Sequence, residues 1–344
     1  MIYVVSYGLI SAVGPTATLS VAAVNAGANA FQASTNINKN NAPMITAQIP
    51  AEALPVLADS LIKEPLTQQE RRLIQLAIPA IQEVSKSLKK DAPIPLFLAG
   101  PESIVEANRS GARRLIIKYI AEMAGVNIDL PSSRYLASGR TGVIEAIELA
   151  YRYFAVSASD FVLIGGVDSY LDAITLGTLD ADDRIKAENI LDGFVPGEAA
   201  GFLLLSRIKL SDRCVGVHQP ALEMEEGSYY SDKPYRGDAL SKAVSTAINQ
   251  GQGKKISGIY SSMNGEHYFS KEYGVSVIRN ASTIAAEYKI FHPADSWGDI
   301  GAATGVGLIA LSAAHLFKTQ DDLCHLIYAS SDGPNRAAVC VERI

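Results

Sequence analysis

The sequence is poor in cysteine, and the few thiols it has are scattered. Its three cysteines, Cys214, Cys324 and Cys340, show no C-x-x-C spacing, which supports neither a disulfide framework nor a zinc site. None of them opens an expected helix or neighbours a histidine in sequence, as an activated thiolate would. We therefore expect no metal, no cofactor and no cysteine nucleophile, and we interpret Cys340 as a small buried hydrophobe.

The sequence also lacks an excess of positive charge and a long apolar run. It has 30 Lys and Arg against 36 Asp and Glu, a formal net charge of -6, which argues against nucleic acid as a partner. No apolar run approaches the ~18 residues of a membrane span. The first residues, MIYVVSYGLISAVG, have neither the basic start nor the Ala-x-Ala-like cleavage site of a signal peptide. We expect a first strand here and a cytoplasmic protein with no membrane span.

Residues 134–169 combine three features in a row. A turn of small residues comes first, then a helix with an apolar face, then an apolar strand that ends in Gly165-Gly166. The apolar face is formed by Val143, Ile144, Ile147, Tyr151 and Phe154. The turn at 138–142 has almost no side-chain bulk, so the first amides of the helix are expected to bind an electron-rich group.

The rest of the chain alternates between expected strands and helices, and the second part repeats the first in outline. The expected strands are 3–9, 94–99, 161–164, 215–224, 256–261 and 337–341, and the expected helices are 18–26, 68–90, 110–123, 238–249, 271–278 and 301–316. Alternation of this kind predicts two layered α/β units packed together, with their boundary near 206–213.

Two motifs resemble those of the β-ketoacyl synthases, the condensing-enzyme family of the thiolase-like superfamily. The turn SGRTG at 138–142 matches the end of the family's T-A-C-A-T-G motif, and LDGFVPGEAAGFLLL at 191–205 resembles R-D-G-F-V-x-G-E-G-A-G followed by a strand. The resemblance implies a thiolase-like α/β fold of two duplicated αβαβα halves in five layers. We place the two halves at 1–208 and 209–344.

The resemblance also implies that the family's catalytic groups are missing. The cysteine position falls on Gly139, the first histidine on Asn264 and the second histidine on Asp299, which makes these three vestigial active-site positions. Glycine cannot form a thioester, and an aspartate, with an ordinary pKa near ~3.9, would repel the negative charge of condensation. Further family positions fall on Glu272 (an acid), Ala294 (a lysine) and residues 332–336 (a phenylalanine-bearing turn).

Three residues near these positions are candidates for the pocket. Ser138 is either a substitute nucleophile or the N-cap of the following helix. His267 is either a base in the loop after Asn264 or a solvated loop histidine. Arg140 either reaches an anion or faces solvent. In each case we take the second interpretation as the simpler one.

Two functions from different classes follow. The first is a catalytically degenerate β-ketoacyl-synthase-like protein that acts in binding or assembly, because the whole chain resembles synthase-like accessory proteins encoded beside type VI secretion effectors. The second is an acyltransferase or 3-oxoacyl synthase acting on acyl-CoA or acyl carrier protein, with Ser138 as nucleophile or as the inactive half of a mixed dimer. Reversible binding of an acyl chain or CoA lies between the two.

The resemblance carries expectations about partners as well. Thiolase-fold proteins pair through an edge strand of the amino-terminal half, so we expect a homodimer. The candidate protein partners are a secretion effector and a related synthase, and the candidate small partners are acyl-CoA and acyl carrier protein.

Overall fold

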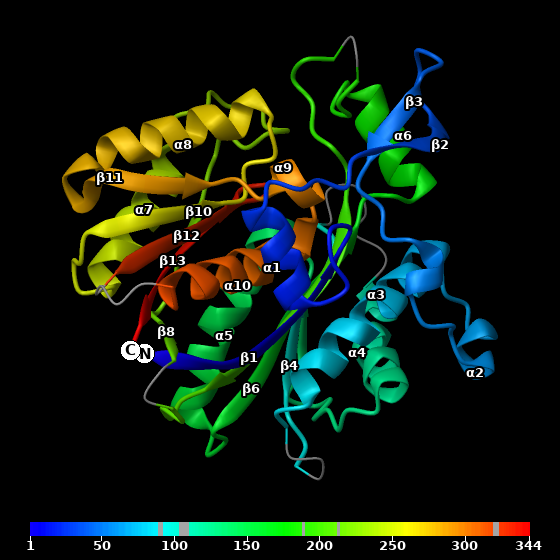
Figure 1. Cartoon of the computed structure of the whole chain (residues 1–344), viewed down its shortest axis with the longest axis horizontal. Coiled ribbons are helices and arrows are strands. Elements are labelled where there is room, and N and C mark those ends of the chain that lie inside the picture. The colour runs from blue at the N-terminus through cyan, green and yellow to red at the C-terminus, as the bar shows by residue number, and fades with distance from the viewer. Residues whose placement is uncertain (89–91, 103–109, 188–189, 212–213, 319–322) are drawn as a thin grey trace.

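A computed structural model describes residues 1–88, 92–102, 110–187, 190–211, 214–318 and 323–344 (Figure 1). None of the helices in these ranges is both long enough and apolar enough to cross a membrane. The main elements form two halves with the same order of strands and helices, and the two sheets are joined along one antiparallel pair, β1 with β8.

The amino-terminal half is a mixed five-stranded sheet with helices on both faces. Its elements are β1 (Ile2–Ser11), α3 (Gln68–Ser85), β4 (Leu96–Ala99), α4 (Ser110–Ala124), β5 (Arg134–Leu136), α5 (Gly142–Val156), β6 (Phe161–Ser169) and β7 (Glu198–Ser206). The strand order is β5-β4-β6-β7-β1. Strand β4 is parallel to both β5 and β6, whereas β7 is antiparallel to both β6 and β1.

The carboxyl-terminal half repeats this arrangement. Its elements are β8 (Val215–Val217), β9 (Ala221–Met224), α7 (Asp238–Gln250), β10 (Ile256–Ser261), α8 (His267–Arg279), β11 (Ile284–Phe291), α10 (Thr304–Leu316), β12 (Cys324–Ser330) and β13 (Asn335–Arg343). The order is β11-β10-β12-β13-β8, and β9 also pairs with β13. Strand β10 is parallel to β11 and β12, and β13 is antiparallel to its neighbours. The expected duplicated α/β fold is confirmed.

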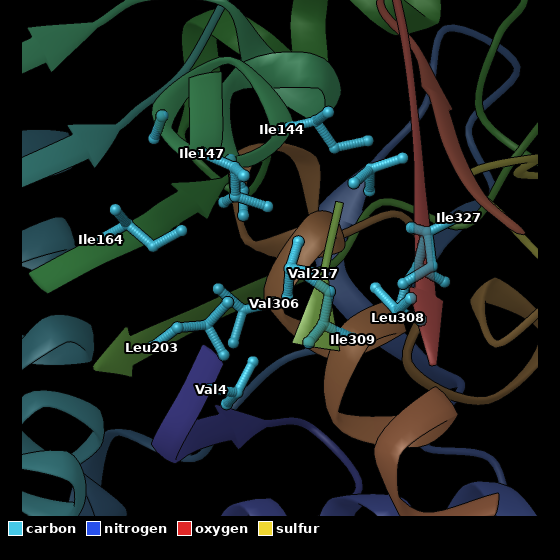
Figure 2. Close-up of a cluster of buried hydrophobic side chains, with 14 of the residues drawn as sticks. Val4, Ile144, Ile147, Ile164, Leu203, Val217, Val306, Leu308, Ile309 and Ile327 are labelled. Carbon is cyan, nitrogen blue, oxygen red and sulfur yellow. The ribbon is translucent and has the colours of Figure 1, made fainter. Parts of the chain in front are cut away.

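Helices α5 and α10 form the central layer between the two sheets (Figure 1). The buried face of α5 carries Ile144 and Ile147, and these meet Leu203 of one sheet and Ile327 of the other in one core (Figure 2). Helix α10 is apolar around most of its circumference, as a helix covered on all sides should be. Burial of this core at ~25 cal/mol per Å² is the main force holding the halves together.

Two outer layers complete the five-layer arrangement. Helices α3 and α4 cover the far face of the first sheet, and their Ile74 and Ile120 belong to the same core as Leu204. Helices α7 and α8 cover the far face of the second sheet, with Leu240 and Phe269 packed in the same core as Leu326. The layers are therefore helix, sheet, helix, sheet, helix.

Shorter helices, turns and strands connect or flank the elements of the five layers. They are α1 (Ala17–Asn25), β2 (Gln32–Ile37), β3 (Pro43–Thr46), η1 (Ala51–Ala53), α2 (Asp59–Ile62), η2 (Gly139–Thr141), α6 (Ala173–Ala181), η3 (Ala281–Thr283), α9 (Ala294–Trp297) and η4 (Gly301–Ala303). Strands β2 and β3 form a separate hairpin beside α6 (Figure 1). Turns η2 and η4 precede α5 and α10, and they contact each other at the interface of the halves.

Several sequence expectations about elements were wrong. The strand expected at 215–224 is two strands, because Pro220 has no amide hydrogen to donate. The helix expected at 68–90 ends at Ser85, and residues 89–91 lie outside the described ranges. Helix α8 begins four residues earlier than expected, at His267. The expected division after residue 208 falls between β7 and β8 and stays a prediction.

Candidate functional site

The structure brings Gly139, Asn264 and Asp299, the three positions predicted to be vestigial, together where η2 and η4 meet. Asp299 precedes η4, and its Oδ2 accepts hydrogen bonds from Arg140 Nε at 2.8 Å and Arg140 Nη2 at 2.5 Å. The same oxygen accepts from Asn264 Nδ2 at 2.9 Å. Arg140 is the residue after Gly139, so all three positions are linked through one guanidinium and one carboxylate.

These contacts belong to a closed circuit. Arg140 also donates to Asp332 at 2.8 Å, and Arg184 donates to the other oxygen of Asp332 at 2.7 Å. Arg184 donates twice to Glu266, both at 2.7 Å, and Glu266 accepts from Asn264 at 2.9 Å, which closes the circuit. We call the six residues the buried ring; they are Arg140, Asp332, Arg184, Glu266, Asn264 and Asp299.

Every side chain of the buried ring is withdrawn from water. Exposure ranges from 0% at Arg184 to 8% at Asn264. Two ring members also stack on aromatic rings, Arg140 at 4.8 Å from the centroid of Phe269 and Arg184 at 4.0 Å from that of Tyr229. Side chains of the ring therefore fill the space between the three vestigial positions.

The ring contains two guanidinium groups and three carboxyl groups, and these charges shift the pKa values of Asp332 and Arg140. Burial alone raises the pKa of Asp332, but Arg140 and Arg184 outweigh it and hold this pKa well below its usual range. Burial likewise lowers the pKa of Arg140, and Asp299, Tyr170 and Asp332 raise it to a net increase. A buried charge is tolerated only when it is paired in this way.

The η2 turn holds Gly139 in a left-handed conformation, with φ of +57°. A Cβ added there would lie 2.9 Å from the Cβ of Glu102. Ser138 lies at the N-cap position of η2, but its hydroxyl donates to Glu145 at 2.7 Å and caps no amide, so the expected capping hydrogen bond is not made. Its partner is a carboxylate and not an imidazole.

The other two candidates lie in different surroundings. Arg140 is 1% exposed, so the expectation that it faces solvent is wrong, and the anions that it reaches are internal carboxylates. The side chain of His267 is 81% exposed, and its Nδ1 lies 2.9 Å from Asp192 on the surface. Its neighbour Glu266 is the residue that enters the buried ring, and His267 is not brought to the ring.

A second buried ion pair lies beside the ring. Glu272, which we predict to lie at the family's acid position, accepts from Arg336 Nε at 2.5 Å and from the hydroxyl of Ser330 at 2.5 Å. Burial raises the pKa of Glu272, and Arg336 opposes that rise. Arg336 also donates to three main-chain carbonyls, and so it fixes the turn between β12 and β13.

Two further carboxyl groups lie near the ring. Asp168 accepts from the amides of Ala302 and Ser169, at 2.8 and 2.9 Å, and burial raises its pKa to about 7. Glu102 accepts from the amides of Gly333 and Asp332, at 2.8 and 3.0 Å, and burial and the charge of Asp332 raise its pKa to about 7.

Sequence reasoning missed the charged partners that complete the site. The motifs do not point to Arg184, Glu266 or Glu102. They do place Asp332 in the turn at 332–336, and Asp299 at a histidine position, but they assign Asp332 no role in the pocket. Two acids at expected active-site positions, Asp299 and Asp332, need cations beside them if they are buried. This requirement was the one signal in the sequence that could have predicted the arginine partners. In the described part of the chain, no group of three or more His, Cys, Asp or Glu is arranged to hold a metal ion.

Comparison with known proteins identifies the class of fold. No protein-family model and no curated protein matches the sequence. Among solved structures, the chain is similar to a ketosynthase from module 6 of the bacillaene synthase of Bacillus subtilis 168, with 13% identity and a TM-score of 0.75 over 99% of this chain and 72% of that one. It is also similar to an oxazolomycin ketosynthase domain of Streptomyces albus JA3453, with 11% identity and a TM-score of 0.77 over 99% and 74%.

A third neighbour spans almost its whole length. It is a ketosynthase in complex with its chain length factor from Xenorhabdus doucetiae, with 14% identity and a TM-score of 0.74 over 100% of this chain and 98% of that chain. At such identities the likeness establishes the fold and not the activity. The protein therefore has the thiolase-like ketosynthase fold.

Proposed function

We propose that this protein is a catalytically degenerate ketosynthase-fold protein that acts in the cytoplasm as a binding or assembly subunit. The observation that carries the proposal is the buried ring, which links Gly139, Asn264 and Asp299. Condensation needs a nucleophile that holds the acyl chain and donors that stabilise the developing negative charge. Here the nucleophile's position is a glycine, and Asp299 presents a carboxylate that accepts hydrogen bonds from Arg140 and Asn264.

The nature of the partner belongs to the same proposal. The sequence resembles accessory proteins of type VI secretion effector loci, so we propose a secretion effector as the protein partner and a related synthase as the alternative. One structural neighbour is a complex of a ketosynthase with its chain length factor, and another contains an acyl carrier protein with its ketosynthase. We further propose that the chain forms a homodimer through β5.

Affinity capture tests the partner. The tagged protein is expressed at its native level in its own cells, and an unrelated tagged protein serves as the control. We expect a stoichiometric effector or synthase, recovered again when the two are produced together from purified components. Recovery of general chaperones alone contradicts the accessory role.

A second function is favoured by one observation, the hydrogen bond of 2.7 Å from the Ser138 hydroxyl to Glu145. A carboxylate in this place could accept the hydroxyl proton, which would make Ser138 an acyl acceptor. The same carboxylate also accepts from Thr141 at 2.7 Å, which suits a structural role equally well.

Intact-mass measurement separates the two functions. The protein and its S138A variant are incubated with acyl-CoA and with acyl carrier protein. If the protein is catalytically degenerate, neither protein should increase in mass. A rise of the Tm with CoA in the absence of turnover would indicate reversible binding. An acyl adduct on the natural chain that S138A abolishes would overturn the degenerate assignment and establish the transferase.

A further inference from the structure

Glu102 makes a contact between the two halves that the buried ring does not explain. The residue follows β4, whereas the amides that it meets lie in the turn between β12 and β13 (Figure 1). One carboxylate oxygen accepts from Gly333 N at 2.8 Å and the other from Asp332 N at 3.0 Å. Two consecutive amides thus hold two oxygens of one carboxyl group, which is how main-chain amides bind carboxylates as ligands.

The surroundings of Glu102 are shaped to admit this side chain. A Cβ added at Gly333 would lie 2.7 Å from Glu102 Oε1, and a Cβ added at Gly139 would lie 2.9 Å from Glu102 Cβ. Both glycines therefore leave room for it. Glu102 itself is half-buried, unlike the ring, so part of this residue is open to solvent.

We propose that the amides of Asp332 and Gly333 form a binding site for a small aliphatic carboxylate, and that Glu102 occupies this site as an internal ligand that an external carboxylate must replace. Among the described residues, the charged groups that face it are the guanidinium of Arg140, which favours a carboxylate, and the side chain of Asp332, which opposes one. The raised pKa of Glu102 indicates that the site holds a carboxyl group more tightly with a proton present. Binding should therefore strengthen as the pH falls.

Truncation of the internal ligand and addition of an external one tests the proposal. Thermal unfolding of E102A is followed with about 100 mM sodium acetate and with sodium chloride at the same ionic strength. Acetate, compared with chloride, should raise the Tm of E102A by about 2 °C or more. The shift should be larger at about pH 6 than at about pH 8.5. The natural chain should not respond, since Glu102 already fills the site.

The matched control is E52A, which truncates an exposed glutamate. An equal acetate shift in E52A, in the natural chain and in E102A would show a general solvent effect and overturn the proposal. The absence of a shift in E102A would overturn it too. If E102A does not fold alone, acetate but not chloride must restore its far-UV circular dichroism, and failure to do so again overturns the site.

This inference extends the proposed binding role of the same region, and the two can fail separately. An acyl adduct on Ser138 would overturn the degenerate assignment and leave the acetate result intact. If acetate had no effect on E102A, the proposed carboxylate site would be overturned, but the proposal that the protein lacks a nucleophile would not be affected.

Discussion

Arg140 is one of two arginines of the first half, with Arg184, that neutralise buried carboxylates of the second half. It comes from the η2 turn of the first half, and both carboxylates that it binds, Asp299 and Asp332, come from the second half. We predict that R140M lowers the free energy of unfolding by about 3–5 kcal/mol, because Asp299 loses its cation inside the protein and Asp332 keeps only Arg184. Urea denaturation followed by circular dichroism measures the change.

The control for this substitution is R152A. Arg152 pairs with Glu148 at 2.9 Å within α5, but its side chain is 71% exposed. An exposed pair is screened by water, so R152A should cost less than about 1 kcal/mol. Equal losses in R140M and R152A would show that the buried ring contributes no more than an ordinary surface pair.

Glu102 makes stability depend on pH. Its pKa is raised from 4.5 to about 7 by burial and by Asp332, so the folded protein binds this proton more tightly than the unfolded chain. The stabilisation is complete below about pH 4.5 and is lost as the pH rises through about 7. We predict that E102Q reduces the difference in unfolding free energy between pH 5 and pH 8 by roughly 2–3 kcal/mol.

Urea denaturation at both pH values measures that difference for each protein. The amide group in E102Q has one acceptor oxygen fewer than the carboxyl group. Its loss lowers the free energy of unfolding by an amount that does not depend on pH, so we compare only the change in stability with pH. Asp168, whose pKa is also raised to about 7, is present in both proteins and cancels. Parallel pH profiles for E102Q and the natural chain would show that Glu102 does not hold the proton.

Among the elements, the η2 turn decides whether the family's nucleophile could be restored. Gly139 has φ of +57°, and an added Cβ would meet Glu102 at 2.9 Å. We predict that G139C is destabilised by about 1–3 kcal/mol and takes up no acyl group in an intact-mass assay with acyl-CoA. The thiol would stand beside the buried ring, next to Asn264 and Asp299, which we predict to occupy the positions of the family's histidines.

The matched control is G274A, in the middle of α8, where an added Cβ meets no atom within 4 Å. Alanine favours a helix over glycine, so this variant should gain up to about 1 kcal/mol. If G139C formed a thioester and supported condensation, the result would contradict our proposal that Asn264 and Asp299 make the site unable to catalyse condensation.

The same comparison shows which elements a single sequence could predict. Helix α5 was predictable because its apolar residues recur at helical spacing and one face is buried. Strand β5 has three residues and β11 alternates weakly, with charged Glu287 and Lys289 on its exposed side, so neither gave a usable pattern. The position of Asn264 and Asp299 at one site followed from motifs, whereas their ring partners depend on contacts between distant segments.

At the scale of the whole molecule, the two sheets form one continuous series of hydrogen-bonded strands. Among the described residues, its two edge strands are β5 and β11. An edge strand offers main-chain donors and acceptors to another chain. The proposed homodimer uses β5, so that the sheets of two subunits would continue into each other. Its formation depends on main-chain hydrogen bonds at a strand of only three residues.

Y135P tests this arrangement, because proline has no amide hydrogen and is tolerated in proteins only at sheet edges. We predict that sedimentation equilibrium gives twice the monomer mass for the natural chain and the monomer mass for Y135P. The control A286P places proline in exposed backbone of β11, at the opposite end of the strand path, and should remain dimeric. Circular dichroism must show both variants folded. A dimeric Y135P, or a monomeric A286P, would move the interface away from the amino-terminal edge.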